Sequence, residues 1–273
     1  MSPTPSRGMP NEELKKAAEA GWDEMSETYQ RDSRISVDDV HYSPLGPGER
    51  ELGLIGDVRG KHALELACGA AQNSIALAKW GAFTTGLDLS KNQLAYARRL
   101  IEQENVEVNL VRGDAENLAM FQDEAFDLIV SSFGVEFVPD LGECFRNCRR
   151  VLKAGGLLII CTAHPLAAFE WAEEQKALIV TDYFHPPVEV WGELSGTGRK
   201  GLTFFRTLEA MTGLLADAGF ALQRIAEPYP YALPEMTEEE KVEKIAYGGP
   251  FWEEMYERFS RVPFSIVYKA FKV

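Results

Sequence analysis

The segment 62–90 constrains the fold of this 273-residue chain more than any other. A short apolar run leads into a loop of small residues, 68–71, and then into apolar residues at helical spacing that Gly81 ends. A second apolar run ends at Asp88. This order of strand, turn, helix and strand is typical of a doubly wound α/β nucleotide fold. In that fold the ligand binds outside the carboxyl ends of the strands, at the turn after the first strand.

The charge around this turn indicates which nucleotide it holds. A dinucleotide site needs three spaced glycines and a helix amino terminus for its pyrophosphate, but here the positions are Ala67, Gly69 and Gln72. Glu65, on the first strand, would repel a pyrophosphate. A carboxylate instead attracts a ligand with an ammonium and a sulfonium, which favours S-adenosylmethionine (SAM). Asp88 would then accept hydrogen bonds from both ribose hydroxyls, as the second-strand acid does in related sites.

Four blocks of the sequence resemble the class I SAM-dependent methyltransferases. Residues 65–71 resemble the family signature Asp/Glu-x-Gly-x-Gly-x-Gly, with Ala67 and Ala71 at the first and third glycine positions. Residues 113–118, 126–133 and 151–160 follow in the family's order, so that the resemblance covers roughly 54–162 and is closest to the small-molecule, UbiE-like branch (methyltransferase type 11). The resemblance implies an α/β fold with a doubly wound, seven-stranded, mostly parallel sheet and an antiparallel last strand. It also implies SAM as cofactor and S-adenosylhomocysteine as product.

The same resemblance implies roles for residues at the strand ends. Asp114 would accept a hydrogen bond from the adenine amino group, although a turn-capping role is the alternative. The backbone oxygens of Ser131 and Ser132 would hold the methionine ammonium. Tyr29 would fold over the cofactor, or would be a core aromatic residue. The expected cofactor-binding residues are Tyr29, Glu65, Ala67, Cys68, Gly69, Asp88, Leu89, Asp114, Ala115, Ser131 and Ser132.

Two ionisable side chains are candidates for a general base. His164 follows the expected fifth strand, 157–162, and histidine titrates near neutral pH, although it could instead only shape a turn. Glu136 is the one ionisable residue in 133–138, and a solvated or capping residue is its alternative. A base is needed only for an alcohol acceptor, because a thiolate, an amine or an acidic phenol could react without one.

Two insertions after the fifth strand suggest a substrate lid. Residues 165–201 are aromatic and poorly periodic, and in this fold an insertion there lies over the cleft, although packing on the amino-terminal helix is the alternative. We divide the chain into a tail and helical cap (1–55), a core (56–164 and 202–273) and lid insertions (165–201 and 228–262). The candidate lid residues are His41, Tyr42, Tyr183, His185 and Trp191, with a surface loop as the alternative for the first two.

Composition limits the partners. The net charge of −14 and the lack of a basic cluster disfavour nucleic acid as a substrate. No apolar run is long enough to span a membrane, and residues 1–10 lack the apolar region of a secretory signal, so we expect a cytoplasmic protein. Cys144 and Cys148 are one helical turn apart, but nothing completes a zinc set, and no metal is expected.

The sequence therefore predicts transfer of the SAM methyl group to a small organic acceptor by in-line displacement. Proximity and orientation can supply about 7–11 kcal/mol of such a barrier. The accepting atom and the oligomeric state stay open. Three alternatives stay open. The first is a SAM-binding protein with non-methylating chemistry such as cyclisation, and the second is a nicotinamide dehydrogenase, which Glu65 and Gln72 disfavour. The third is a protein methyltransferase or partner-dependent subunit with an acidic docking surface.

Overall fold

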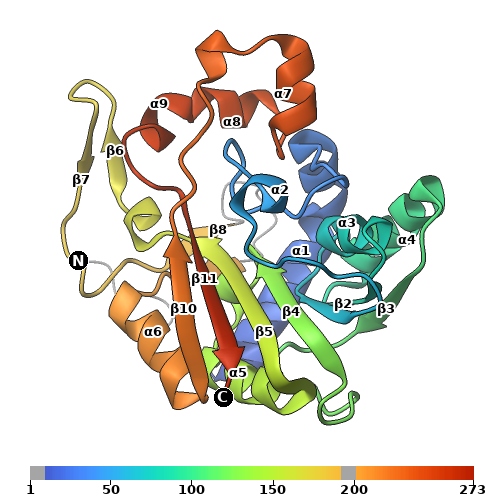
Figure 1. Cartoon of the computed structure of the whole chain (residues 1–273). Helices are drawn as coiled ribbons and strands as arrows, with labels where there is room; N and C mark the ends of the chain where they lie inside the picture. The colour runs from blue at the N-terminus through green and yellow to red at the C-terminus, as the bar shows by residue number, and fades with distance from the viewer. Residues whose placement is uncertain (1–9, 192–200) are drawn as a thin grey trace.

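A seven-stranded sheet forms the centre of the computed structural model, which describes residues 10–191 and 201–273 (Figure 1). The strand order is β10-β11-β5-β4-β1-β2-β3. All the strand pairs are parallel except those of β11, which runs antiparallel to β5 and β10. The predicted fold class is thus confirmed. The strands are β1 (His62–Leu66), β2 (Phe83–Asp88), β3 (Val108–Arg112), β4 (Phe126–Ser132), β5 (Leu152–Ala163), β10 (Phe220–Ala226) and β11 (Ser265–Lys272).

Helices cover both faces of the sheet because the buried strands are apolar on both sides. Along β5, Leu158 and Ile160 belong to the core beneath α5 and α6, whereas Ile159 and Cys161 belong to the core beneath α3. This alternation follows from the two-residue period of a strand. The helices around the sheet are α1 (Asn11–Ser33), α2 (Glu49–Leu52), α3 (Gln72–Lys79), α4 (Lys91–Glu104), α5 (Leu141–Val151) and α6 (Leu208–Asp217).

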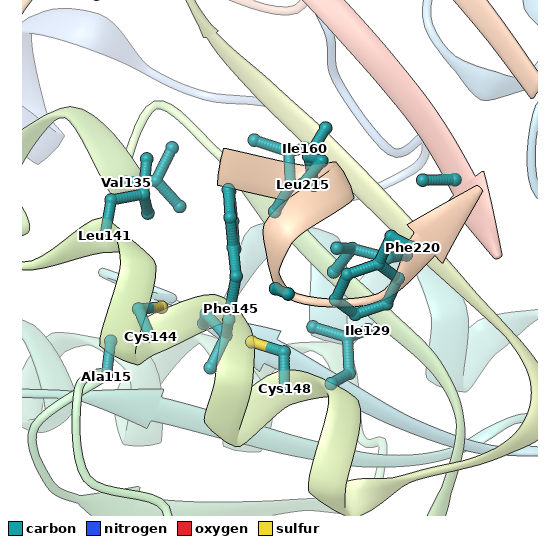
Figure 2. Close-up of a cluster of buried hydrophobic side chains, with 14 of the residues drawn as sticks. Ala115, Ile129, Val135, Leu141, Cys144, Phe145, Cys148, Ile160, Leu215 and Phe220 are labelled. Carbon is teal, nitrogen blue, oxygen red and sulfur yellow. The ribbon is translucent and has the colours of Figure 1, made fainter. Parts of the chain in front are cut away.

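The core beneath α5 contains two of the four cysteines. Figure 2 shows Cys144 and Cys148 among apolar side chains from the sheet and from the helices α5 and α6. All four cysteines are buried free thiols. Within the described ranges, no group of three or more His, Cys, Asp and Glu side chains is placed to hold a metal ion.

The strand boundaries differ most from the sequence-based expectation in β5. This strand begins at Leu152 instead of Leu157, directly after α5. A register irregularity opposite β4, between Phe126 and Leu128, and a left-handed Gly155 (φ 69°) accommodate the early start. Glycine adopts this conformation without a steric penalty.

The two insertions form small elements around the sheet. The first forms the hairpins β6 (Glu170–Ala172) with β7 (Ala177–Ile179) and β8 (Glu189–Trp191) with β9 (Gly201–Thr203). The second forms α7 (Glu238–Lys244), α8 (Pro250–Glu254) and α9 (Tyr256–Phe259), which lie beyond the carboxyl end of β10 (Figure 1). Short 3₁₀ helices are η1 (Val135–Phe137), η2 (Pro165–Ala168) and η4 (Leu233–Glu235). None of the described helices is long and apolar enough to cross a membrane.

Candidate cofactor and active site

A cavity that is partly open to solvent lies where the adjacent parallel strands β4, β1, β2 and β3 end, with α1 contributing part of its wall. Its lining includes residues at and after these strand ends. They are Glu65, Ala67, Cys68, Gly69, Asp88, Leu89, Asp114, Ala115, Ser132 and Phe133. The cavity thus occupies the position at which a doubly wound sheet binds its ligand.

The turn after β1 has a left-handed backbone at three alternate positions. The φ angles are 49° at Ala67, 53° at Gly69 and 61° at Ala71. These are the three glycine positions of the signature, so two of them carry a Cβ in a conformation that disfavours one. Gly134 makes room for the first, because a Cβ added at Gly134 would lie only 2.6 Å from the Cβ of Ala67.

Glu65 lies buried at the base of this turn. One carboxylate oxygen, Oε2, accepts hydrogen bonds from the backbone N–H (2.8 Å) and the hydroxyl (2.6 Å) of Ser74, in the first turns of α3. Burial raises the pKa of Glu65 to about 7 in spite of these bonds. A cation bound in the cavity would favour the ionised form of this carboxyl group.

Asp88, at the end of β2, has a fixed orientation. Its Oδ2 accepts a hydrogen bond from the Gly69 N–H and its Oδ1 accepts one from the Ser90 N–H, each at 2.8 Å. Each carboxylate oxygen can accept a further hydrogen bond. Burial raises the pKa of Asp88 to about 6. The side chain can therefore receive two hydroxyl groups from a ligand in the cavity.

Asp114, after β3, caps a turn and forms an ion pair, and its contact with adenine stays a prediction. Oδ1 accepts a hydrogen bond from the Glu116 N–H at 2.8 Å, as a turn-capping residue does. Oδ2 lies 2.7 Å from the Lys15 ammonium, which is also 2.6 Å from Glu116. This ion triad joins α1 to the loop after β3, and Asp114 and Ala115 still line the cavity.

The helix α1 passes along the cavity and is joined to its rim by polar side chains. Gln30 accepts a hydrogen bond from Gln72 (2.6 Å) and donates one to Gln93 (3.0 Å), above the turn that contains Gly69. Trp22 packs edge-on against Tyr29, with 5.3 Å between the ring centroids. Sequence reasoning missed Lys15, Gln30 and Gln93, because their roles depend on how α1 lies across the sheet.

Aromatic side chains gather in one part of the cavity, which we call the aromatic end: Tyr29, His41, Phe133 and Tyr247. The His41 ring lies parallel to Phe133 (6.2 Å between centroids) and edge-on to Tyr247 (5.3 Å). Burial raises the pKa of Tyr29 to about 12 and that of Tyr247 well above its ordinary value, so both hydroxyls stay protonated near neutral pH. The sequence did not single out Tyr247 as a cavity residue, because it follows the acidic helix of the second insertion, far along the chain from the cofactor motifs.

His164 does not lie where a general base for this cavity would have to be. It is not among the cavity-lining residues, and both of its ring nitrogens are engaged. Nδ1 accepts a hydrogen bond from the Leu166 N–H at 3.1 Å, and Nε2 lies 3.0 Å from Glu227. Because burial lowers the pKa of His164, the neutral ring donates its Nε2 proton to Glu227 and has no free acceptor. His164 therefore offers no free acceptor nitrogen to this cavity in the arrangement described, and its role as a base stays a prediction.

Glu136 and Ser131 are also absent from the cavity lining. Glu136 is buried, with Oε2 accepting from the Thr162 hydroxyl at 3.2 Å, and burial raises its pKa to about 7. The Ser131 hydroxyl donates to the Leu66 carbonyl at 2.9 Å. Neither lines the cavity, whereas Ser132 does. The role of Glu136 as a base stays a prediction.

Some of the candidate lid residues line the cavity and others do not. His41 lines the cavity, but Tyr42 is fully buried in the core, with its hydroxyl 2.9 Å from Glu49. Tyr183 and His185 are not cavity-lining residues; His185 is exposed and lies 3.0 Å from Asp182. The backbone of Trp191 belongs to β8, and its side chain lies outside the described part of the structure. No described residue of 165–201 lines the cavity.

Comparison with known proteins places the chain in a family. A family profile described as a methyltransferase domain matches residues 64–160. Ubiquinone biosynthesis O-methyltransferase of Coxiella burnetii is 36% identical over 105 residues, which cover 38% of this chain and 44% of that protein. Demethylmenaquinone methyltransferase of Listeria welshimeri is 30% identical over 178 residues, which cover 61% of this chain and 72% of that protein. The chain thus matches less than half of the length of the Coxiella relative.

Solved structures share the fold over most of the chain. A SAM-dependent methyltransferase from Mesorhizobium loti has a TM-score of 0.63 at 23% identity, covering 81% of this chain and 95% of the other. The [4+2]-cyclase SpnF has a TM-score of 0.60 at 18% identity, covering 93% and 94%. With the sequence relatives, the sheet and the cavity, these findings define the protein class. The chain belongs to the class I SAM-dependent methyltransferases, whose cofactor is SAM.

Proposed function

We propose that this protein transfers the methyl group of SAM to a small organic acceptor bound at the aromatic end of the cavity. The observation that carries the proposal is the pair of carboxylates, the buried Glu65 and the half-buried Asp88, in one cavity at the strand ends. The lining cation Lys15 is already paired with Asp114 and Glu116. Such a cavity suits a cationic nucleoside better than a pyrophosphate.

The residues of the cavity match the parts of the cofactor from one end to the other. Asp114 and Ala115 would receive the adenine, Asp88 the ribose hydroxyls, and the backbone near Ala67 and Ser132 the methionine portion, with Glu65 beneath. SAM supplies a methyl group that is already activated on its sulfonium. The protein's task is therefore to align the acceptor and to exclude water, which α1 and the aromatic end can do.

The proposal of a small-molecule acceptor has two supports. Two relatives, the ubiquinone biosynthesis O-methyltransferase and the demethylmenaquinone methyltransferase, are named for small-molecule acceptors of the quinone type. The net charge of −14 also disfavours nucleic acid. The second insertion contributes Tyr247 to the cavity, and we propose that this insertion and α1 form the lid. We also propose that the protein is located in the cytoplasm.

The test is an incubation of the purified protein with methyl-labelled SAM and a cell extract. We expect label on small molecules, and we expect Asp88→Ala to abolish it while the surface control His62→Gln, at the opposite end of β1, does not. Label on proteins alone would contradict the proposal. SAM binding without any transfer would favour the second candidate, non-methylating chemistry, for which the fold shared with a cyclase gives a precedent.

A further inference from the structure

His41 is a buried residue of the aromatic end whose backbone is fixed on both sides. Its N–H donates to Asn73 Oδ1 at 3.0 Å, and its carbonyl accepts from the Ser132 hydroxyl at 2.8 Å. The side chain lines the cavity, although the residue is only 6% exposed. The loop that carries His41 is thereby attached both to α3 and to the end of β4.

One ring nitrogen of the His41 imidazole has no partner in the protein. Nδ1 is buried without a hydrogen-bond partner among the described residues, as is Nδ2 of the neighbouring Asn73. A buried polar atom without a partner costs free energy, and such atoms in native structures call for an explanation, of which ligand binding is one. Burial lowers the pKa of His41 to about 4, outweighing the opposite effect of the Asn73 side chain, so the ring is neutral near pH 7.

The side chains that line the cavity around His41 carry no formal charge. Glu136, which acts electrostatically on Tyr29 and Tyr247, does not itself line the cavity. Phe133, Tyr247, Tyr29 and Ile35 line this end of the cavity, and both tyrosines stay protonated. Ile35 and Tyr247 are joined by a backbone bridge, which brings the amino-terminal loop and the second insertion together here. An acceptor with a carboxylate or phosphate group would have no lining cation beside it within the described residues, and burying an unpaired charge is costly.

A neutral imidazole offers one N–H donor and one acceptor nitrogen. A hydroxyl group can accept from the first or donate to the second, so it pairs with either tautomer of the ring. Aromatic rings in turn pack favourably on Phe133 and Tyr247, edge-on or offset.

We propose that His41 is the residue that selects the acceptor, by a hydrogen bond to a hydroxyl group of an uncharged aromatic compound that packs against Phe133 and Tyr247. This inference rests on the proposed methyl transfer and specifies its substrate class. His41 acts as a binding contact, and no proton transfer is assigned to it.

The test uses two variants with a matched control and the labelled products from the extract. His41→Phe keeps a ring against Phe133 and Tyr247 but removes the hydrogen bond. His41→Gln removes the ring but keeps a polar amide that can both donate and accept. His62→Gln removes an exposed histidine at the other end of β1.

We expect most of the label on products that are uncharged at pH 7, absorb ultraviolet light and are not retained by an anion exchanger. With the partly purified acceptor, His41→Phe should lower kcat/KM by about 10- to 100-fold, mainly through KM, as the loss of a hydrogen bond in a buried site does. His41→Gln should recover a large part of this loss. The dissociation constant of SAM should change less than twofold in every variant.

Three results would overturn the inference. The first is label on carboxylates or phosphates, and the second is wild-type kcat/KM in His41→Phe. The third is an equal loss in both His41 variants together with weaker SAM binding, which would indicate a purely structural role. An extract without any labelled small molecule contradicts the proposed function itself, so the two failures can be told apart.

Discussion

At the scale of single residues, Glu65 has the environment with the clearest consequence for binding. Burial raises its pKa to about 7, and burial likewise raises that of Asp88 to about 6. Each carboxyl group therefore holds its proton at a higher pH in the folded protein than in the unfolded chain. Because the folded state binds more protons in that range, the free energy of unfolding falls as the pH rises from about 4.5 to 7.

SAM binding should therefore tighten as the pH rises. A bound sulfonium and ammonium favour the carboxylate, so binding below pH 7 must release the Glu65 proton. We expect the dissociation constant, measured by calorimetry, to fall several-fold between pH 6 and pH 8. Glu65→Gln should bind more weakly at pH 8 and lose most of this pH dependence. If the dissociation constant of Glu65→Gln varies with pH as in the wild-type protein, the released proton comes from a group other than Glu65.

The left-handed alanines of the turn give a second prediction at this scale. Ala67 has a φ of 49°, where a Cβ is disfavoured. Ala67→Gly should therefore stabilise the fold by about 1 kcal/mol and raise the melting temperature by roughly 2–4 °C. The control Ala70→Gly, at a buried position without a positive φ, should lower it. Equal destabilisation by both changes would show that the backbone strain is not released.

At the scale of elements, α1 is joined to the cavity rim by polar contacts and by the packing of Trp22 on Phe137, with 5.1 Å between the ring centroids. Asp23 accepts hydrogen bonds from the Ser90 hydroxyl (2.7 Å) and from the Asn92 N–H (3.2 Å), at the start of α4. Lys15 and Gln30 make further polar contacts at two other places along the helix. Contacts of this kind contribute less net free energy than apolar burial, so α1 can open at moderate cost.

Loosening α1 should speed the release of the cofactor. Asp23→Ala removes the contacts to the start of α4, and we expect roughly a 5- to 30-fold faster dissociation of SAM together with faster amide exchange in α1. Glu24→Ala, an exposed position on the same helix, is the matched control. Stopped-flow displacement measures the rate. Unchanged release in Asp23→Ala would mean that SAM leaves by a path that does not involve α1.

At the scale of the whole molecule, the sequence was sufficient for the sheet and for most of the residues that line the cavity. Glu65, Asp88 and Asp114 lie at or just after the ends of apolar runs, and parallel strands bring these ends to one edge. The same reasoning did not place His164, because β5 lies beyond β4 and the side chain contacts Glu227 after β10. Each strand adds about 4.8 Å to the distance between a strand end and the cavity, and the local sequence pattern does not reveal this distance.

The lid was harder to predict because it depends on long-range packing. The first insertion has the aromatic composition of a lid, yet its described residues do not line the cavity, and the second insertion contributes Tyr247. The loop around Tyr42 resembles a surface loop in composition. Its burial depends on Glu49, whose carboxylate accepts from the Tyr42 hydroxyl and from the Leu54 and Ile55 N–H groups. Contacts between residues in loops, or between residues far apart in the sequence, produce no periodic pattern in the sequence from which they could be predicted.

The most direct test of the central claim is a calorimetric comparison of SAM and NAD⁺ binding to the wild-type protein and to Asp88→Ala. We predict binding of SAM and no comparable binding of NAD⁺, with SAM weakened by about 10- to 100-fold in Asp88→Ala, because two charge-assisted hydrogen bonds to the ribose are lost. Preferential binding of NAD⁺, or SAM binding unaffected by the loss of Asp88, would contradict the assignment of this cavity.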